Sequence, residues 1–136
     1  MKNDSPIKPK SEAEWQRQLS PEEYQVLRQK ATELPGSGRY YLTKDPGEYR
    51  CAGCGLLLFN SDHKYDSGSG WPAFDRPSEP EAVTAVEDRS LGLVRTEIQC
   101  RNCGGHLGHL FTDGPTETTG LRYCINSRAL KFKPKD

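Results

Sequence analysis

The fold of this chain depends on two matching segments, Cys51-Ala52-Gly53-Cys54-Gly55 and Cys100-Arg101-Asn102-Cys103-Gly104. A CxxC pair brings two thiolates within reach of one ion, and two such pairs complete a tetrahedral site of four sulfurs. A glycine follows the second cysteine of each pair, so the backbone can turn tightly and present N–H groups to the sulfurs. The two segments therefore predict a structural metal site made of Cys51, Cys54, Cys100 and Cys103.

The 45 residues between the two pairs (55–99) exceed the roughly 15–20 residues of the simple zinc motif. The ion is therefore expected to join two hairpins that lie far apart in the chain. Zinc is preferred over iron, although four thiolates suit both metals. Two alternatives stay open for these four residues, a pair of disulfides and four free thiols. Purified protein without stoichiometric zinc or iron would reject the metal.

The composition explains why a metal is needed. Hydrophobic residues make up 33% of the 136 residues, a low share for a globular domain. A structural zinc contributes about 10–16 kcal/mol of apparent binding free energy in small zinc peptides, which would support a thin core. The 19 basic and 19 acidic residues give zero net charge. Because nucleic-acid binders carry a clustered positive excess, no nucleic-acid partner is expected.

Neither a membrane segment nor a secretory signal is expected. The longest apolar run, Leu56–Phe59, is far shorter than the roughly 20 residues that a bilayer requires. Residues 1–10 are polar and contain two prolines, unlike a signal peptide. The default compartment is therefore the reducing cytoplasm, where disulfides are rare. We expect a flexible lead-in over residues 1–10 and a single domain over residues 11–136, a length typical of one domain.

The remaining pattern predicts two short helices followed by strands. Ser11 and Glu14 fit a capping box, and Ser20 precedes Pro21 as a second helix start, so helices are expected near residues 12–33. Helical spacing of apolar residues continues as far as Leu34. Beyond residue 36, short runs at 40–42, 48–50, 83–86, 91–98, 121–127 and 129–132 alternate with Gly, Pro and Ser clusters. This texture indicates a mainly β domain, antiparallel and sandwich- or barrel-like.

Cys124 is left outside the metal set. In the segment 122–126, the two-residue period of a strand places Arg122, Cys124 and Asn126 on one face, with Tyr123 and Ile125 on the other. A fixed cation beside a thiol lowers the thiol pKa and increases the share of nucleophilic thiolate. The alternative is a buried structural cysteine, which is inert.

Two further segments carry candidate chemistry. His106 and His109 lie just after the second metal pair. Because four cysteines complete the metal site, both imidazoles are expected to be free to donate protons near neutral pH. The alternative is a hydrogen-bonded pair without chemistry. The glycine-rich segment 67–70 runs into Trp71, which either fills the core or walls an apolar pocket.

Together these segments resemble the methionine sulfoxide reductase B family. The similarity runs from about Trp15 to Phe132 and is carried by residues 65–74, 106–111, 113–115 and 122–127, in this order and with both CxxC pairs. The resemblance implies two antiparallel sheets, short N-terminal helices and a structural Zn²⁺ far from the active site. It also implies an enzyme of protein repair under oxidative stress, which reduces the R epimer of methionine sulfoxide, either protein-bound or free.

The resemblance further implies roles for seven residues. Cys124 matches the nucleophile, and Trp71 matches the wall that holds the methyl group of the sulfoxide. The polar, catalytic side of the pocket is matched by His106, His109 and Asn126, and two residues lie close to the bound substrate, Arg122 and Asp113. Oxygen transfer to Cys124 would leave a sulfenic acid on its sulfur.

One departure from the family pattern concerns regeneration of the thiol. Many members carry a second, resolving cysteine where this chain has Ser69, and no cysteine precedes Cys51. With four cysteines on the metal, none is left to form an intramolecular disulfide with Cys124. An external thiol is therefore expected to reduce the sulfenic acid, with thioredoxin, glutaredoxin and a small thiol such as glutathione as candidates.

Two other function classes use some of the same residues. A zinc-ribbon-like interaction module without catalysis explains the metal cysteines but gives no role to Cys124, and a fully active Cys124→Ser variant would favour it. A thiol hydrolase would use cysteine, histidine and asparagine for acyl transfer. A hydrolase needs no reductant, so omission of dithiothreitol from an assay separates it from a reductase.

Overall fold

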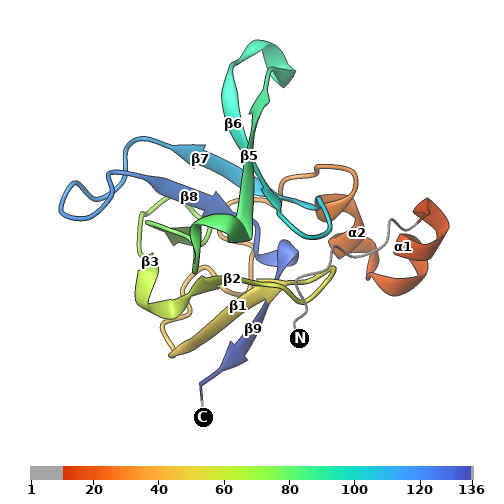
Figure 1. The fold of residues 1–136 in the computed structure, drawn as a ribbon, viewed down its shortest axis with the longest axis horizontal. Helices are drawn as coiled ribbons and strands as arrows, with labels where there is room; N and C mark the ends of the chain where they lie inside the picture. The colour runs from red at the N-terminus through yellow and green to blue at the C-terminus, as the bar shows by residue number, and fades with distance from the viewer. Residues whose placement is uncertain (1–10, 136) are drawn as a thin grey trace.

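The computed structural model describes residues 11–135, and these residues form two short helices and two antiparallel sheets (Figure 1). The lead-in predicted for residues 1–10 lies outside the described residues, as does residue 136. The fold class predicted from the sequence, mainly β with short N-terminal helices, is confirmed.

Both helices begin where the sequence predicts. Helix α1 spans Glu12–Gln18, and its capping box joins Ser11 and Glu14 through reciprocal hydrogen bonds. Helix α2 spans Pro21–Leu27 and begins with a second capping box, between Ser20 and Glu23. These bonds satisfy backbone N–H groups that have no partner inside a helix.

Helix α2 is shorter than the apolar spacing predicts. It ends at Leu27, and Lys30 adopts a positive φ of 60°, which breaks the helical path. The N–H of Ala31 then donates to the carbonyl of Gln25. Leu34, which helical spacing would bury, is 74% exposed. Residues 30–36 therefore form a non-helical segment, and the prediction of helix through this segment is wrong.

The two sheets differ in size and share no strand. The smaller sheet has the order β2 (Leu57–Asn60), β1 (Gly47–Cys51), β9 (Leu130–Pro134). The larger sheet has the order β3 (Lys64–Tyr65), β4 (Ala73–Phe74), β8 (Arg122–Ile125), β7 (His106–Phe111), β6 (Arg95–Cys100), β5 (Val83–Asp88). Four 3₁₀ turns lie between strands, at Ser61–His63, Pro80–Ala82, Ser90–Gly92 and Ser127–Ala129. The β5–β6 hairpin projects from the body (Figure 1).

Strand predictions succeeded where the strand is regular. Runs 48–50 and 83–86 lie within β1 and β5, and 121–127 contains β8. Run 129–132 overlaps β9, which begins one residue later. Run 40–42 is wrong, because Tyr41 and Thr43 donate to carbonyls three residues earlier and form turns. The strand predicted over 91–98 is wrong for residues 91–94, because a 3₁₀ turn at Ser90–Gly92 precedes β6, which begins at Arg95.

An aromatic core joins the two sheets. Tyr49 of β1, Phe59 of β2 and Phe74 of β4 are fully buried. The rings of Phe59 and Phe74 stack with centroids 4.3 Å apart, and Tyr49 meets Phe74 edge-on at 5.2 Å. Such ring pairs contribute about 0.5–1.5 kcal/mol each beyond the apolar area that they bury. The small core is therefore concentrated in a few large side chains.

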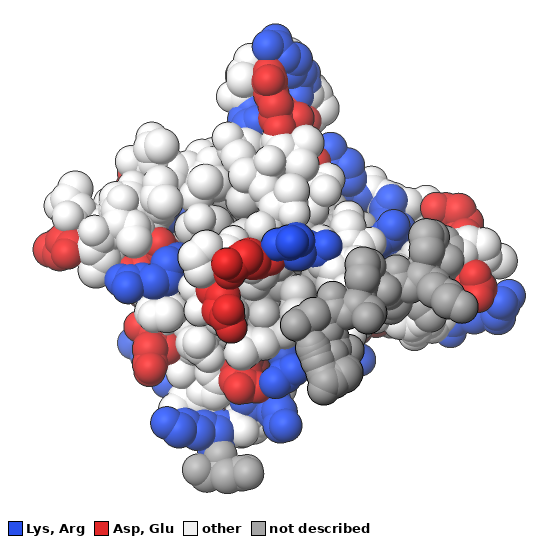
Figure 2. All heavy atoms as spheres, in the orientation of Figure 1, with Lys and Arg blue, Asp and Glu red and all other residues white. Residues whose placement is uncertain are grey.

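The surface carries charges of both signs. Figure 2 shows acidic and basic side chains interspersed over one face, in agreement with the zero net charge. Among residues 11–135, the helices are too short and too polar to cross a membrane.

Candidate functional site

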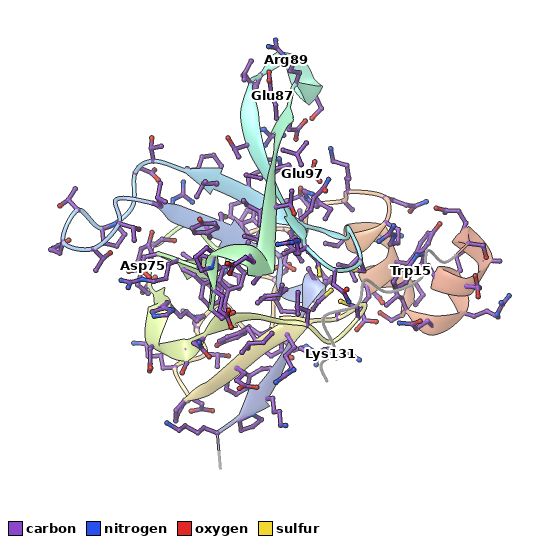
Figure 3. The ribbon with its side chains drawn as sticks, in the orientation of Figure 1. Trp15, Asp75, Glu87, Arg89, Glu97 and Lys131 are labelled. Atoms are coloured by element: carbon purple, nitrogen blue, oxygen red, sulfur yellow. The ribbon has the colours of Figure 1, made fainter. Side chains whose placement is uncertain are left out.

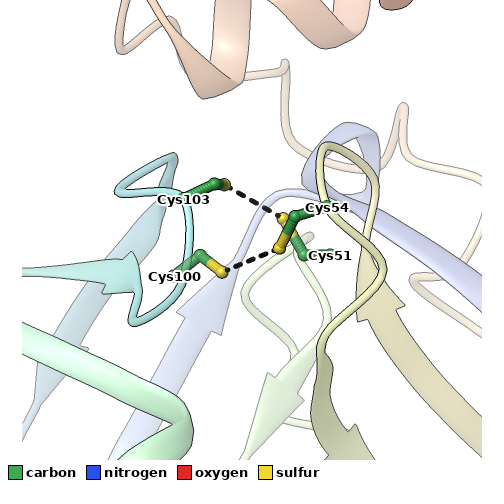
Figure 4. A group of neighbouring side chains, drawn as sticks. All are labelled: Cys51, Cys54, Cys100 and Cys103. Carbon is green, nitrogen blue, oxygen red and sulfur yellow. Dashed lines mark hydrogen bonds between the residues drawn. The ribbon is translucent and has the colours of Figure 1, made fainter. Parts of the chain in front are cut away.

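The four cysteines of the CxxC pairs converge at the ends of two hairpins from different sheets (Figure 4). Cys51 ends β1 and Cys54 lies in the turn toward β2, whereas Cys100 ends β6 and Cys103 lies in the turn toward β7. All four Sγ atoms lie within 4.8 Å of one another. This confirms that the four residues predicted as ligands meet at one site that can hold a metal ion.

The spacing of the sulfurs fits tetrahedral coordination. The Sγ atoms of Cys51 and Cys103 are 3.7 Å apart, and those of Cys54 and Cys100 are 3.5 Å apart. Four thiolates around one Zn²⁺ at about 2.3 Å lie about 3.8 Å from one another. A disulfide bond would need about 2.05 Å, and all five cysteines are free thiols. The geometry therefore favours metal ligation over the disulfide alternative.

Glycine gives both metal loops the tight turn that the sequence predicts, but the N–H that donates to a sulfur is that of Gly53, to the Sγ of Cys51 at 3.3 Å. Gly55 and Gly104 have positive φ angles of 86° and 75°. Their N–H groups donate to the carbonyls of Cys51 and Cys100, each at 2.9 Å. A residue with a Cβ would be strained in this conformation. The two loops thus hold their cysteines in matching orientations.

Cys124 lies in a separate pocket of about 210 Å³. Strand β8 places it between two neighbours, because Cys124 pairs with Ala73 of β4 and with His109 of β7. Residues directly opposite in an antiparallel pair have side chains on the same face. The pocket is lined by Thr32, Ser69, Trp71, Arg95, Gly108, His109, Phe111, Arg122, Cys124 and Asn126.

The predicted faces of β8 are confirmed. Arg122, Cys124 and Asn126 all line the pocket. Ile125 is fully buried in the core, and Tyr123, on the same face of the strand as Ile125, packs against that core. The regular period of a strand therefore identified three pocket residues from five consecutive positions.

Trp71 is held at the pocket wall by hydrogen bonds. Its indole N–H donates to the carbonyl of Glu33 at 2.9 Å. Its backbone N–H donates to the hydroxyl of Ser69 at 3.3 Å, and this hydroxyl also accepts from Ser67 at 2.8 Å. The alternative in which Trp71 fills the core does not hold, since Trp71 is half-buried and lines the pocket.

Asn126 is buried, and both the nitrogen and the oxygen of its side-chain amide form hydrogen bonds. Its Nδ2 donates to the carbonyl of Leu107 at 3.0 Å, and its Oδ1 accepts from the N–H of Glu33, also at 3.0 Å. The amide group carries two N–H bonds, so one remains to face the pocket. The side chain can therefore present a hydrogen-bond donor near Cys124 in one defined orientation.

The two histidines occupy different environments. His109 lines the pocket, and its Nε2 lies 2.8 Å from the Asp88 carboxylate. This hydrogen bond from His109 holds the pKa of Asp88 well below its usual range. Asp88 is therefore ionised at neutral pH, and its carboxylate accepts a hydrogen bond from the protonated Nε2 of His109. The Nδ1 of His109 is then left for other partners.

His106 is buried behind the pocket and does not line it. Its Nδ1 lies 2.8 Å from Glu97, whose other carboxylate oxygen lies 3.2 Å from the Lys30 ammonium. Burial raises the pKa of Glu97, but the bonds from His106, Gln99 and Lys30 outweigh burial and lower it. Burial lowers the pKa of His106, so its ring is neutral at neutral pH. Figure 3 shows Glu97 below the tip of the projecting hairpin.

Arg122 and Asp113 form an ion pair at the pocket rim. The Arg122 Nε lies 2.8 Å from Asp113, and its guanidinium stacks 4.4 Å from the Phe111 ring centroid. The Asp113 side chain is 69% exposed and does not line the pocket. The hydrogen bond from Arg122 lowers the pKa of Asp113. Asp113 therefore orients Arg122 and does not itself face the pocket.

Comparison with known proteins agrees with this arrangement. A family model described as the SelR domain matches residues 19–134. The chain belongs to the SelR family. It is 55% identical to "Peptide methionine sulfoxide reductase MsrB" of Leptospira interrogans, over 91% of this chain and 94% of that protein. The protein of the same name from Bradyrhizobium diazoefficiens is 57% identical over 93% of this chain and 90% of its own length. The resemblance to the methionine sulfoxide reductase B family is thus confirmed.

A solved structure shares the fold of this SelR-family chain. The Yippee-like domain of Mis18 superposes with a TM-score of 0.53 and covers 67% of this chain and 98% of its own. The two sequences are 18% identical, so the likeness concerns the fold alone.

Sequence reasoning missed four pocket residues of this SelR-family chain, namely Thr32, Arg95, Gly108 and Phe111. Gly108 had a detectable signal, since it lies between the two histidines. A Cβ at this position would lie 1.9 Å from the carbonyl oxygen of Cys124, so only glycine lets β7 approach β8. The other three come from a loop and two strand ends, and no local pattern marks them.

The sequence predicted that a neighbouring cation lowers the pKa of the Cys124 thiol, but the net direction of the pKa shift is the opposite. Burial raises the pKa of the Cys124 thiol, and this effect outweighs the lowering by Arg122 and by a hydrogen bond from Ser69. Desolvation penalises the thiolate more than one partly exposed cation stabilises it. In the free protein the thiol form of Cys124 therefore predominates at neutral pH.

This balance predicts the pH dependence of alkylation. The rate at which iodoacetamide labels Cys124, followed by peptide mass spectrometry, is expected to rise with pH to a midpoint above that of N-acetylcysteine measured alongside. Arg122→Met removes the cation and should move the midpoint higher still, because the thiolate loses a nearby positive charge that lowers the thiol pKa.

Arg89→Met provides the control, since Arg89 lies at the tip of the projecting hairpin (Figure 3). Its midpoint should equal that of the unmodified chain. A midpoint for Cys124 below that of N-acetylcysteine would contradict the dominance of burial.

Proposed function

We propose that this SelR-family chain reduces the R epimer of methionine sulfoxide in oxidised proteins, with Cys124 as the nucleophile. The observation that carries the proposal is the position of Cys124, a thiol outside the metal set in a pocket that also holds Trp71 and His109. The names of the relatives at 55–57% identity support methionine sulfoxide reduction as the activity.

The pocket offers one group for each part of the substrate. The Trp71 ring provides an apolar wall for the methyl group of the sulfoxide. His109 lines the same pocket, and in its doubly protonated form it would give the Nδ1 proton to the sulfoxide oxygen while its Nε2–H stays bonded to Asp88. Asn126 adds a fixed amide donor for the same oxygen. We assign the proton to His109 and a supporting role to His106, because the buried His106 ring packs 5.4 Å from the His109 ring.

The reaction transfers one oxygen atom between two sulfurs. The Cys124 sulfur attacks the sulfoxide sulfur and forms an S–S bond, His109 gives a proton to the oxygen, and the thiol proton of Cys124 replaces it on His109. The S–S bond and the sulfoxide S–O bond then break as the oxygen moves to the Cys124 sulfur. The oxygen ends on Cys124 as a sulfenic acid, and the substrate leaves as methionine, so Cys124 is oxidised by two electrons and the sulfoxide is reduced by two. A protonated oxygen is needed because an unprotonated oxide leaves sulfur poorly.

An external thiol completes the cycle in this proposal. A first thiol attacks the Cys124 sulfenic acid to form a mixed disulfide and water, and a second thiol then releases the Cys124 thiol. Thioredoxin, glutaredoxin and glutathione remain the candidate reductants, since Ser69 stands beside Cys124 in the pocket where a resolving cysteine is found in many relatives. Reliance on reduced thiols favours the cytoplasm, where the protein would repair oxidised proteins.

The four metal cysteines fit a structural Zn²⁺ in this proposal. They would hold the ion between the two sheets, where it supplies a crosslink and takes no part in the reaction. Residues 11–136 would act as a single catalytic domain around this crosslink, and the family match to residues 19–134 supports this extent.

The two epimers of a blocked methionine sulfoxide test the proposal. With dithiothreitol as reductant, the R epimer should be consumed and the S epimer should remain, because a chiral pocket that holds the methyl group at Trp71 and the oxygen at His109 accepts one configuration at sulfur. Chiral chromatography of the substrate measures both. Consumption of S alone would overturn the stereochemistry, and turnover of neither would overturn the reductase itself.

A further inference from the structure

Residues 30–36 form a non-helical strap beside the pocket. Lys30 at its start reaches Glu97, the partner of His106. At its end, the N–H of Gly36 donates to the carbonyl of Gly70 at 2.7 Å, beside Trp71. Thr32 in its middle lines the pocket. The strap therefore touches several of the elements that carry the site.

The backbone of Glu33 connects the strap to two pocket residues at once. Its N–H donates to the Oδ1 of Asn126, and its carbonyl accepts from the indole N–H of Trp71. Each bond fixes one orientation of a side chain that could otherwise rotate. A shift of residue 33 would therefore disturb both the polar and the apolar walls of the pocket.

The side chain of Glu33 anchors this backbone. Its carboxylate is fully buried, and its Oε1 accepts from the N–H of Arg128 at 3.0 Å, two residues after Asn126. The Arg128 guanidinium lies 4.0 Å away. Gly38 makes room for the other oxygen, since a Cβ there would lie 2.2 Å from Oε2.

Stability does not explain a carboxylate in this place. The Oε2 atom of Glu33 is buried and has no hydrogen-bond partner among the described residues. A buried carboxylate with an unsatisfied oxygen costs folding free energy, whereas an apolar side chain of similar size would not. A function other than stability is therefore required for this side chain.

We propose that Glu33 is a positioning residue of the reductase site: its buried side chain fixes the strap 30–36, and the strap holds Trp71 and Asn126 in their working orientations. Glu33 does not contact the substrate and acts through these two residues. The inference rests on the proposed function, because the orientations of Trp71 and Asn126 affect activity only if the chain is a reductase.

Kinetics of variants with resolved R-sulfoxide provide the first test. Glu33→Ala should lower kcat/KM about tenfold, the effect expected when one or two hydrogen bonds lose their geometry, with a rise in KM from the Trp71 wall. Glu33→Gln keeps an oxygen that accepts from Arg128 and should stay within about threefold of the unmodified chain. Leu34→Ala changes an exposed neighbour on the same strap and should leave both constants unchanged.

A double-mutant cycle separates positioning from a general structural role. Trp71→Phe keeps an aromatic wall but removes the N–H that reaches Glu33. If Glu33 acts through Trp71, Glu33→Ala should cost clearly less in the Trp71→Phe background than alone. If Glu33→Ala lowers kcat/KM by the same factor in the Trp71→Phe background as it does alone, the inference is overturned. Glu33→Asp, which withdraws the carboxylate from Arg128, takes the place of Glu33→Ala if that variant does not fold.

Indole N–H exchange gives a readout that does not depend on activity. The chain has two tryptophans, so proton–nitrogen spectra should show two indole signals, with Trp15 as the internal reference. Glu33→Ala should accelerate solvent exchange of the Trp71 signal about tenfold or more and leave the Trp15 signal unchanged. An unchanged Trp71 signal would overturn the positioning of Trp71. A chain that shows this effect but reduces neither epimer would instead reject the proposed function.

Discussion

Cys124→Ser is expected to lower methionine sulfoxide turnover by about 10³-fold or more, the scale seen when a nucleophile is removed from an active site. A serine hydroxyl is far less nucleophilic than a thiol and forms no sulfenic acid. The substitution keeps the side-chain volume nearly constant, so the melting temperature and the metal content should match those of the unmodified chain. Reductase assays, calorimetry and metal analysis on the same sample measure all three.

Trapping of the oxidised thiol tests the same residue from the other direction. After R-sulfoxide is added without reductant, dimedone should label Cys124 in high yield, and Cys124→Ser should show no label. The four remaining sulfurs lie together at the metal site, and none of them lines the pocket. An intramolecular disulfide to Cys124 in the peptide map would contradict the one-cysteine cycle. Full biological activity of Cys124→Ser without sulfoxide turnover would favour an interaction module.

Local signals predicted the parts of the molecule that depend on local geometry. The capping boxes placed both helix starts, because a cap is complete within four residues. The CxxC pairs placed four ligands, since each pair is preorganised by its own turn. The alternation along β8 placed Arg122, Cys124 and Asn126 on the pocket face.

Sequence patterns did not predict the parts of the molecule that depend on contacts between residues far apart in the chain. In a regular strand, His106 and His109 would point to opposite faces. A bulge between β6 and β7 shifts the register after Ile98, and the two rings lie 5.4 Å apart. No local pattern marks this bulge. The bulge pairs His109 with Glu97 and His106 with Gln99, so both rings lie on the same face of the sheet.

The strap shows the same limit. Apolar spacing through Leu34 predicts helix, but the bonds of Glu33 to Trp71, Asn126 and Arg128 exist only in the loop conformation. These partners lie 38 or more positions away in the chain. Tertiary hydrogen bonds therefore override a weak helical preference, which is a common outcome for short apolar patterns.

Removal of the metal is expected to unfold the protein. A zinc site of this kind would contribute about 10–16 kcal/mol, which is comparable to the entire stability of about 5–15 kcal/mol typical of a domain. The core of this chain is small, so little is left to hold the sheets together without the ion. Circular dichroism during titration with a strong chelator should show loss of the β signal as zinc is released, with about one zinc per chain by elemental analysis.

The ligands come from hairpins of two different sheets, which allows a more specific prediction for single cysteine variants. Cys54 lies in the turn between two strands of the smaller sheet and Cys103 in the turn between two strands of the larger one, so a bound Zn²⁺ would link the two sheets. Cys54→Ser and Cys103→Ser should therefore lower the melting temperature to a similar extent, by about 20 °C or more, with Cys124→Ser as the unaffected cysteine control. A metal-free chain that kept its melting temperature would overturn this prediction, because the buried core would then hold the sheets together without the ion. The core is small, and its ring pairs contribute only about 0.5–1.5 kcal/mol each beyond the area that they bury, whereas ordering each residue costs about 1–2 kcal/mol.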